Sequence, residues 1–79
     1  MKIYDFGGKK NISGERIKAH RRALGLSQSE LAARLQVGGV NIERDSLSRI
    51  EIGTRFVADY EIAAIADALG VGVEDLLQR

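Results

Sequence analysis

The sequence predicts an all-α fold of five short helices around one hydrophobic core. From residue 12 onward, apolar residues recur at spacings of three and four, the period of an α-helix, and no segment alternates with the period of two that a half-buried strand requires. Glycines stand where these apolar patterns stop, as residues that end helices do. The 79 residues suffice for a single core but not for two, so we expect one helical domain.

The first helix is expected over residues 13–24. Ser13 is a residue type that caps helix N-termini, and Gly25 is the residue type that most often follows a helix C-terminus. Between them, Ile17 and Leu24 fall on one apolar face, opposite charged residues. The pattern predicts an amphipathic helix that packs through this face.

The second helix, residues 28–37, has the clearest predicted start. Ser27 and Glu30 have the spacing of a capping box, in which the serine hydroxyl and the glutamate carboxylate each bind a free backbone N–H. Leu31 and Leu35 then line the inner face of the helix. Two consecutive glycines follow and weaken any continuation, so we expect a loop or a frayed turn there.

The third helix is expected over residues 44–52, with Gly53 as its stop. At 100° per residue, Leu47 and Ile50 point to the same side and predict the packed face. The rest of the helix surface is expected to face solvent. Its side chains fall within an arc of about 140° and are Arg44, Asp45, Ser48, Arg49 and Ile52.

Two further helices complete the predicted fold. The fourth is expected over residues 59–69, with carboxylates in its first turn and Gly70 at its end. A short fifth helix is expected over residues 73–78. Residues 1–11 show no helical period, so we divide the chain into an N-terminal arm, 1–11, and a helical domain, 12–79.

The charges are distributed unevenly along the chain. Residues 1–22 carry seven basic and two acidic side chains, whereas residues 51–79 carry two basic and six acidic ones. The net charge of +1 hides this separation. A basic end and an acidic end favour a molecule with one face suited to a polyanion, although a charged surface is often merely solvated.

The residue types that catalysis and metal binding require are scarce. There is no cysteine, and His20 is the only histidine, so neither a disulfide nor a thiolate or histidine metal site is expected. His20 has no serine or aspartate partner nearby in sequence, and the glycine pairs lack the Lys-Ser/Thr of a phosphate-binding loop. We therefore predict no enzyme activity, no cofactor, no catalytic residue, no metal and no small-molecule effector.

Nothing in the sequence predicts export or a membrane span. No uncharged apolar run approaches the roughly 20 residues that would cross a bilayer, and the first 20 residues lack the apolar stretch of a signal peptide. We therefore expect a cytoplasmic chain with no membrane partner.

Three motifs occur in a fixed order between residues 17 and 77. They are Leu-Ser-Gln-x-Glu-Leu-Ala, Ser-Arg-Ile-Glu and Ala-Leu-Gly-Val. In this order the sequence resembles the phage repressor and Cro-like (XRE-type) helix-turn-helix family. The resemblance implies a repressor-like DNA-binding domain, in which helix 28–37 lies across the DNA backbone and helix 44–52 enters the major groove.

The exposed face of helix 44–52 has side chains suited to base recognition. Arg44 and Arg49 can donate to guanine O6 and N7, and Asp45 can accept from cytosine N4. Ser48 can bond either a base or a phosphate. The alternative for any one of these residues is a surface charge or a phosphate contact, so the face is the firmer prediction.

A second group of residues is expected to contact the DNA backbone. Gln28 lies in the first turn of the second helix, where members of the family commonly bond a phosphate and free N–H groups favour an anion. Ordinary solvated side chains are the alternative for the other candidates. These are Lys9, Lys10, Lys18, Arg22, Thr54 and Arg55.

The resemblance also implies a structural ion pair. Arg21 on the first helix and Glu51 on the third occupy positions that form a partly buried pair in such relatives. We assign both residues to structure rather than to DNA.

The sequence departs from the family pattern between the second and third helices. About five extra residues, within residues 38–43, lengthen the connection. This leaves the start of the third helix open by two residues, so Arg44 and Asp45 could precede it. Ser48 and Arg49 are placed more firmly.

These observations predict a sequence-specific transcriptional regulator that binds double-stranded DNA as a homodimer on a pseudo-palindromic site. The dimer contact could come from Leu77 or from the arm around Ile3, Tyr4 and Phe6, with core packing as the alternative. The alternative function is a protein-interaction module of the same fold, antitoxin-like or regulator-binding, with weak or no DNA binding. The net charge of +1 leaves that alternative open.

Overall fold

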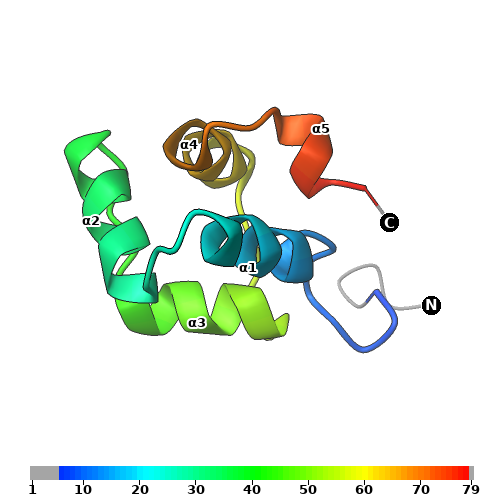
Figure 1. The fold of residues 1–79 in the computed structure, drawn as a ribbon. Coiled ribbons are helices and arrows are strands. Elements are labelled where there is room, and N and C mark those ends of the chain that lie inside the picture. The colour runs from blue at the N-terminus through cyan, green and yellow to red at the C-terminus, as the bar shows by residue number, and fades with distance from the viewer. Residues whose placement is uncertain (1–5, 79) are drawn as a thin grey trace.

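The computed structural model describes residues 6–78 and confirms the all-α fold. Within this range α1 lies between α3 on one side and α4 and α5 on the other, and α2 packs across one end (Figure 1). Strand-type pairing among the described residues is limited to one isolated bridge between Phe6 and Lys9. The helices are α1 (Gly14–Ala23), α2 (Gln28–Val37), α3 (Arg44–Ile52), α4 (Asp59–Leu69) and α5 (Val73–Leu76).

Helices α2, α3 and α4 have the bounds expected from the sequence. The capping box before α2 is formed: Ser27 Oγ accepts from the Glu30 N–H at 3.0 Å, and Glu30 Oε1 accepts from the Ser27 N–H at 2.8 Å. α5 is shorter than expected and ends at Leu76, because Leu76 is its buried side chain whereas Leu77 is 43% exposed. The last residues therefore have little packing to hold them in a helix.

The start of α1 differs from the expectation. Ser13 has helical backbone angles (φ −96°, ψ −14°), and its side chain makes no capping bond. A capping side chain needs an extended backbone. Asn11 caps the helix instead, because its Oδ1 accepts from the N–H groups of Ser13 at 3.1 Å and Gly14 at 2.8 Å.

The end of α1 also differs from the expectation. Leu24, expected on the apolar face, follows the helix as its C-cap residue and is 50% exposed. The buried face of α1 consists of Gly14, Ile17 and Arg21. The third buried position is therefore polar, and Leu24 lies past the end of that face.

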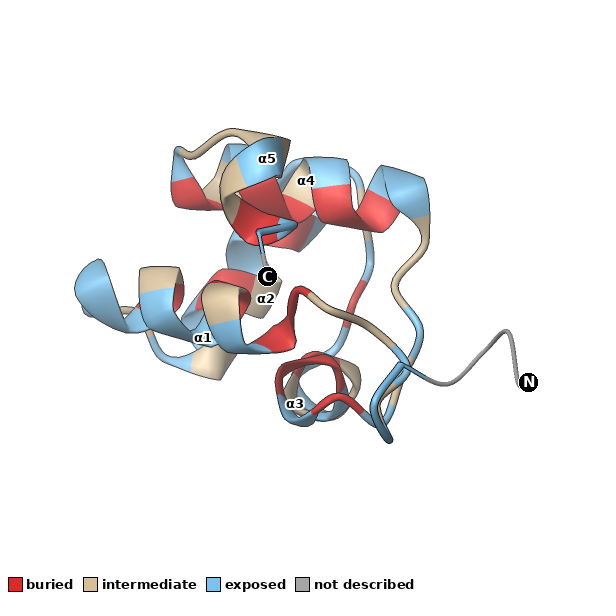
Figure 2. Cartoon of the chain, turned by 90° about the vertical axis from the view of Figure 1, so that its right-hand side faces the viewer, coloured by how far each residue is buried: buried red, intermediate tan, exposed pale blue. Residues whose placement is uncertain are grey.

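The core is aliphatic and draws on every helix. Buried sides of the helices turn toward one another and exposed sides face outward (Figure 2). None of the helices in residues 6–78 is long and apolar enough to cross a membrane. The largest fully buried side chains are Ile17, Leu31, Leu35, Leu47, Ile50, Ile65 and Leu76.

The N-terminus of α1 approaches the C-terminal end of α3 very closely. A Cβ atom built on Gly14 would lie 2.3 Å from the carbonyl oxygen of Ile50 and 2.8 Å from that of Glu51. Asn11 also links the start of α1 to α3 and to the segment that follows it. Its Nδ2 donates to the carbonyls of Ile50 at 3.1 Å and Arg55 at 2.8 Å. The absence of a side chain at residue 14 therefore permits the α1–α3 packing.

The described part of the predicted arm is folded against the end of α3. Residues 6–9 form a tight turn, and the Lys10 N–H donates to the carbonyl of Gly53 at 2.8 Å. Gly53 follows α3 with a left-handed backbone (φ +97°), a conformation that favours glycine. Arm residues Ile3 and Tyr4, expected as possible dimer contacts, lie outside the described residues.

Candidate nucleic-acid interface

α3 has one buried face and one exposed face, as its sequence predicts. Leu47 and Ile50 are fully buried. Arg44, Asp45 and Arg49 are exposed, and Ser48 is half-buried. Ile52 completes the outer surface and is 62% exposed. The helix is thus anchored from behind and presents a mostly polar surface.

The lengthened connection leaves Arg44 and Asp45 inside the helix. Glu43 is the N-cap residue, with extended backbone angles (φ −74°, ψ 162°), and Arg44 is the first residue of α3. Ile42, just before it, is buried in the core and fixes this register. The sequence left open whether Arg44 and Asp45 belong to the helix. Both lie in the first turn of α3, one turn before Ser48.

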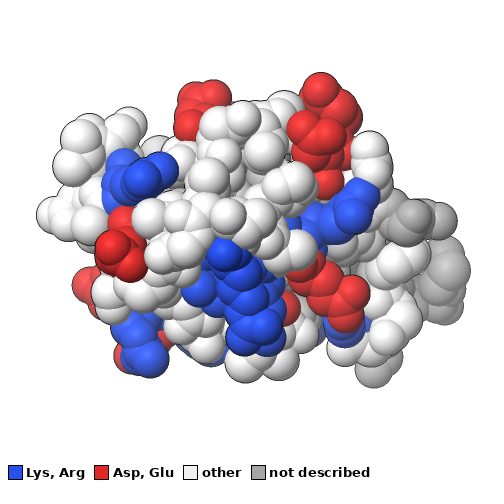
Figure 3. Space-filling view, in the orientation of Figure 1, with Lys and Arg blue, Asp and Glu red and all other residues white. Residues whose placement is uncertain are grey.

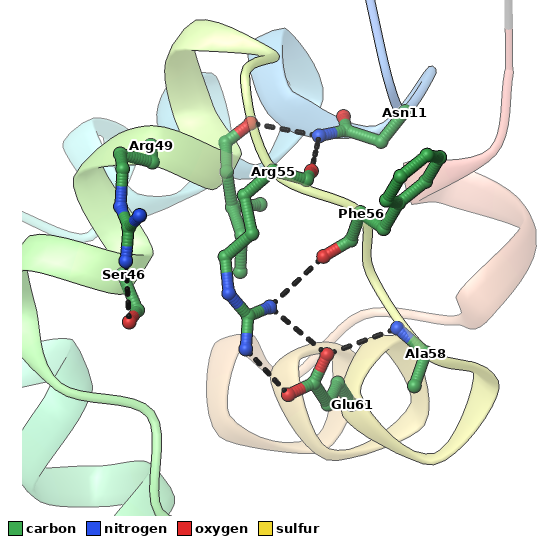
Figure 4. Close-up of polar contacts among 8 residues, drawn as sticks. Asn11, Ser46, Arg49, Arg55, Phe56, Ala58 and Glu61 are labelled. Atoms are coloured by element: carbon green, nitrogen blue, oxygen red, sulfur yellow. Dashed lines mark hydrogen bonds and ion pairs between the residues drawn. The ribbon is translucent and has the colours of Figure 1, made fainter. Parts of the chain in front are cut away.

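The charged side chains on this face have only weak partners within the chain. Arg44 Nη1 lies 3.7 Å from Asp45 Oδ1, and both side chains are well exposed. Arg49 Nη2 lies 3.4 Å from Ser46 Oγ (Figure 4). An exposed ion pair such as Arg44–Asp45 contributes about 0 to 1 kcal/mol, so the chain itself holds these side chains only loosely.

A buried polar network ties α3 to α1 and α2. Arg21 donates to Glu51 twice, from Nε to Oε2 at 2.7 Å and from Nη2 to Oε1 at 2.9 Å. Gln28 Nε2 donates to the same Oε1 at 3.0 Å, and Arg21 Nη1 donates to the Leu26 carbonyl at 2.8 Å. The bonds to Glu51 raise the pKa of Arg21 and keep the guanidinium charged. The pair implied by the resemblance is therefore present, with Gln28 as a third member.

The other expected backbone contacts have different surroundings. Lys18 and Arg22 are exposed on α1. Lys9 Nζ donates to Glu15 at 3.0 Å, and Lys10 Nζ lies 5.0 Å from the centre of the Phe56 ring. All four cations remain at the surface, but only Lys18 and Arg22 belong to a helix, whereas Lys9 and Lys10 precede α1.

Thr54 and Arg55, which follow α3, are engaged within the chain. Thr54 is exposed, and its Oγ1 donates to the carbonyl of Arg49 at 3.3 Å. Arg55 binds both carboxylate oxygens of Glu61 at 3.1 Å and also donates to the Phe56 carbonyl (Figure 4). Its guanidinium lowers the pKa of Glu61, and the Ala58 N–H acts in the same direction. The structure thus uses Arg55 to join the α3–α4 connection to α4.

The surface charges separate broadly by layer. In the view of Figure 3, lysine and arginine side chains gather over the middle and lower part of the molecule, where α1 and α3 lie. Acidic side chains stand out along the upper edge, over α4 and α5, and a few others border the basic group. In this view the part of the molecule formed by α1 and α3 is more basic than the part formed by α4 and α5, as the charge distribution along the sequence indicates.

Sequence reasoning missed three side chains that shape this site. Asn11 caps α1 and holds the end of α3, Ser46 contacts Arg49, and Glu61 holds Arg55. A glutamate at the third position of α4 is a known capping pattern, and asparagine is a residue type that caps helices, but Asn11 lies two residues before the position where a cap is expected. The contact of Ser46 depends on a rotamer, which no spacing rule specifies.

A comparison with protein families gives a match over most of the chain. Residues 14–79 match the family described as the helix-turn-helix domain. No curated protein matches the chain at a significant level.

Among solved structures, three similar ones illustrate the match. The restriction-modification controller protein C.AhdI from Aeromonas hydrophila is 32% identical, covering 80% of this chain and 84% of that one, with a TM-score of 0.71. The clp gene regulator ClgR from Corynebacterium glutamicum is 27% identical over 85% and 80%, with a TM-score of 0.74. The DNA-binding domain of BldD is 29% identical over 86% and 92%, with a TM-score of 0.71.

Proposed function

The chain belongs to the XRE-type helix-turn-helix family of DNA-binding transcriptional regulators rather than to a family of enzymes, and from this premise we propose that it reads specific DNA sequences with α3. The supporting observation is the division of α3 into two faces. Leu47 and Ile50 are fully buried, while the first-turn and second-turn polar residues face outward. An α-helix presented in this way fits the width of the B-DNA major groove.

The residues proposed to read bases supply complementary chemistry. Arg44 and Arg49 donate to guanine O6 and N7, Asp45 accepts from cytosine N4, and Ser48 bonds a base or a phosphate. Each good pair discriminates against the wrong base by about 1 to 3 kcal/mol. The weak pairing between Arg44 and Asp45 supports this role, because it leaves both groups able to bind a base edge.

The proposed backbone contacts flank α3. Gln28 opens α2, the helix that would lie across the phosphates, and Lys18 and Arg22 are exposed on α1. The positive charge of Lys18 and Arg22 would add affinity for any sequence by releasing counterions. The remaining proposed contacts are Lys9, Lys10 and Thr54, all beside the end of α3, whereas the Glu61 pair argues against Arg55.

We also propose that two copies bind one pseudo-palindromic site, with half-sites about one helical turn apart. Exposed apolar side chains at the end of α5 and in the arm support a contact between copies, since Leu77 is 43% exposed and Phe6 51% exposed. A regulator acting in this way would work in the cytoplasm, on the nucleoid.

The test is selection of bound fragments from a pool of random duplexes, followed by affinity measurements against salt. We expect a recovered motif with two-fold symmetry, and a log–log slope of about −0.9 for each phosphate that a cation neutralises. A pool that yields no motif, with no salt-dependent binding to any duplex, would contradict the proposal. That result would favour the protein-interaction module, whose interface need not depend on salt in this way.

A further inference from the structure

The side-chain amide of Gln28 is held by a buried carboxylate on another helix. Gln28 is the first residue of α2 and is half-buried. Its Nε2 donates to Glu51 Oε1 at 3.0 Å, although the two residues are 23 positions apart in the chain. The proposed phosphate contact is therefore in direct contact with the Arg21–Glu51 pair.

The Glu51 carboxylate is buried and is held by hydrogen bonds from two other side chains. Its side chain is only 2% exposed, and its two oxygens accept three hydrogen bonds, two from Arg21 and one from Gln28. Arg21 is itself fixed by its bond to the Leu26 carbonyl in the turn before α2. The carboxylate thus has one position, set by α1 and by the turn.

This fixed carboxylate dictates which side of the amide faces inward. An ionised carboxylate only accepts hydrogen bonds, so the NH2 side of the Gln28 amide must face Glu51 and the carbonyl side must not. An amide nitrogen carries two hydrogens, and the bond to Glu51 uses one of them. The other remains for an acceptor outside the network, such as a phosphate oxygen.

We infer that Glu51 is a positioning residue for DNA binding: its carboxylate holds the Gln28 amide so that the second N–H meets a phosphate. This inference rests on the proposed function. A neutral amide neutralises no phosphate charge, so loss of this contact should lower affinity by the same factor at every salt concentration. Removal of a cation such as Arg22 should instead make the salt slope shallower by about 0.9.

The test is a double-mutant cycle on DNA affinity with Q28A and E51Q, measured on a short duplex of the selected sequence at several salt concentrations. We expect Q28A to weaken binding by about tenfold, as loss of a hydrogen bond to a charged group does. E51Q should weaken binding about fivefold in the wild-type background and less than twofold in the Q28A background. S29A is the matched control, because Ser29 is the exposed neighbour in the same turn, and its effect should add to that of E51Q.

A second measurement uses the unmodified chain, so that the test does not depend on how well E51Q folds. The Gln28 side-chain amide should show restricted motion by 15N relaxation in the absence of DNA, whereas the exposed Gln36 on the same helix should move freely. Equal mobility of the two amides, or equal losses for E51Q in both backgrounds, would overturn the inference alone. Failure of the wild-type chain to bind any duplex would overturn the proposed function and the inference with it.

Discussion

Replacing Gly14 with alanine should destabilise the domain although alanine is the better helix former. Gly14 is the first residue of α1, and its backbone angles are open to any residue. The added methyl group would lie 2.3 Å from the Ile50 carbonyl oxygen and 2.8 Å from the Glu51 carbonyl oxygen. Both atoms belong to the backbone of α3, so no side-chain rotation can relieve the clash.

The magnitude follows from two opposing effects. Alanine in place of glycine gains up to about 1 kcal/mol through helix propensity and the reduced freedom of the unfolded chain. Overfilling a packed contact costs about 1 to 3 kcal/mol. The upper end applies here, because the Cβ atom would lie nearly 1 Å closer to backbone atoms than an ordinary van der Waals contact. We therefore expect a net loss of about 2 kcal/mol, which for a domain of this size lowers the Tm by roughly 8 to 16 °C.

Thermal and urea unfolding of G14A would measure this loss, with G38A as a matched control. Gly38 also has a negative φ, of −77°, but a Cβ there would meet its nearest neighbours at 3.5 Å, an ordinary contact. G38A should therefore leave stability unchanged or raise it by about 0.4 to 1 kcal/mol. A G14A variant that melts as high as G38A would refute the close approach of α1 to α3.

Three further predictions concern charged residues. E51A should lower stability by about 3 to 5 kcal/mol because it leaves its partner guanidinium buried and unpaired, whereas S48A should change the Tm little. The pKa of Glu61 is lowered in the folded state, so the stability that its carboxylate contributes is complete above its ordinary pKa of 4.5 and is lost as the pH falls through the folded pKa. Urea unfolding should therefore show the free energies of unfolding of E61Q and wild type converging in that acidic range. R49A should weaken binding most on the selected duplex, whereas K18A should weaken binding equally on selected and random duplexes; equal losses for R49A would remove its base-reading role.

The sequence was sufficient to predict the helices whose signals are local. The capping box at Ser27 and Glu30, the glycine stops and the apolar spacing act within one or two turns, so they predict α2, α4 and the end of α3 at their observed bounds. The start of α3 follows a lengthened connection, and local signals left it open by two residues. The two faces of α3 follow from the same periodicity, because Leu47 and Ile50 can be buried together only if the intervening polar residues turn outward.

The features that sequence reasoning missed depend on how the folded chain places side chains relative to one another. Asn11 replaces Ser13 as the cap because its amide is also held by the carbonyls of Ile50 in α3 and of Arg55 just after it, about 40 residues later. Folding also brings the Arg55 guanidinium to both carboxylate oxygens of Glu61, a pairing that spacing alone does not reveal. A local rule identifies a residue that can cap or pair, and the tertiary fold then determines which candidate does so.

The contacts of α3 suggest a reason why its polar face can vary without loss of the fold. At its C-terminal end, Glu51 is fixed by Arg21, and the Ile50 carbonyl is held by Asn11 against Gly14. On its outer face the charged side chains of Arg44, Asp45 and Arg49 make only weak contacts within the chain, so the free energy of unfolding depends little on them. Stability and the proposed recognition of DNA are thus assigned to different faces of one nine-residue helix. Under the proposed function, changes at the exposed positions alter the preferred DNA sequence while the buried face continues to hold the helix in place.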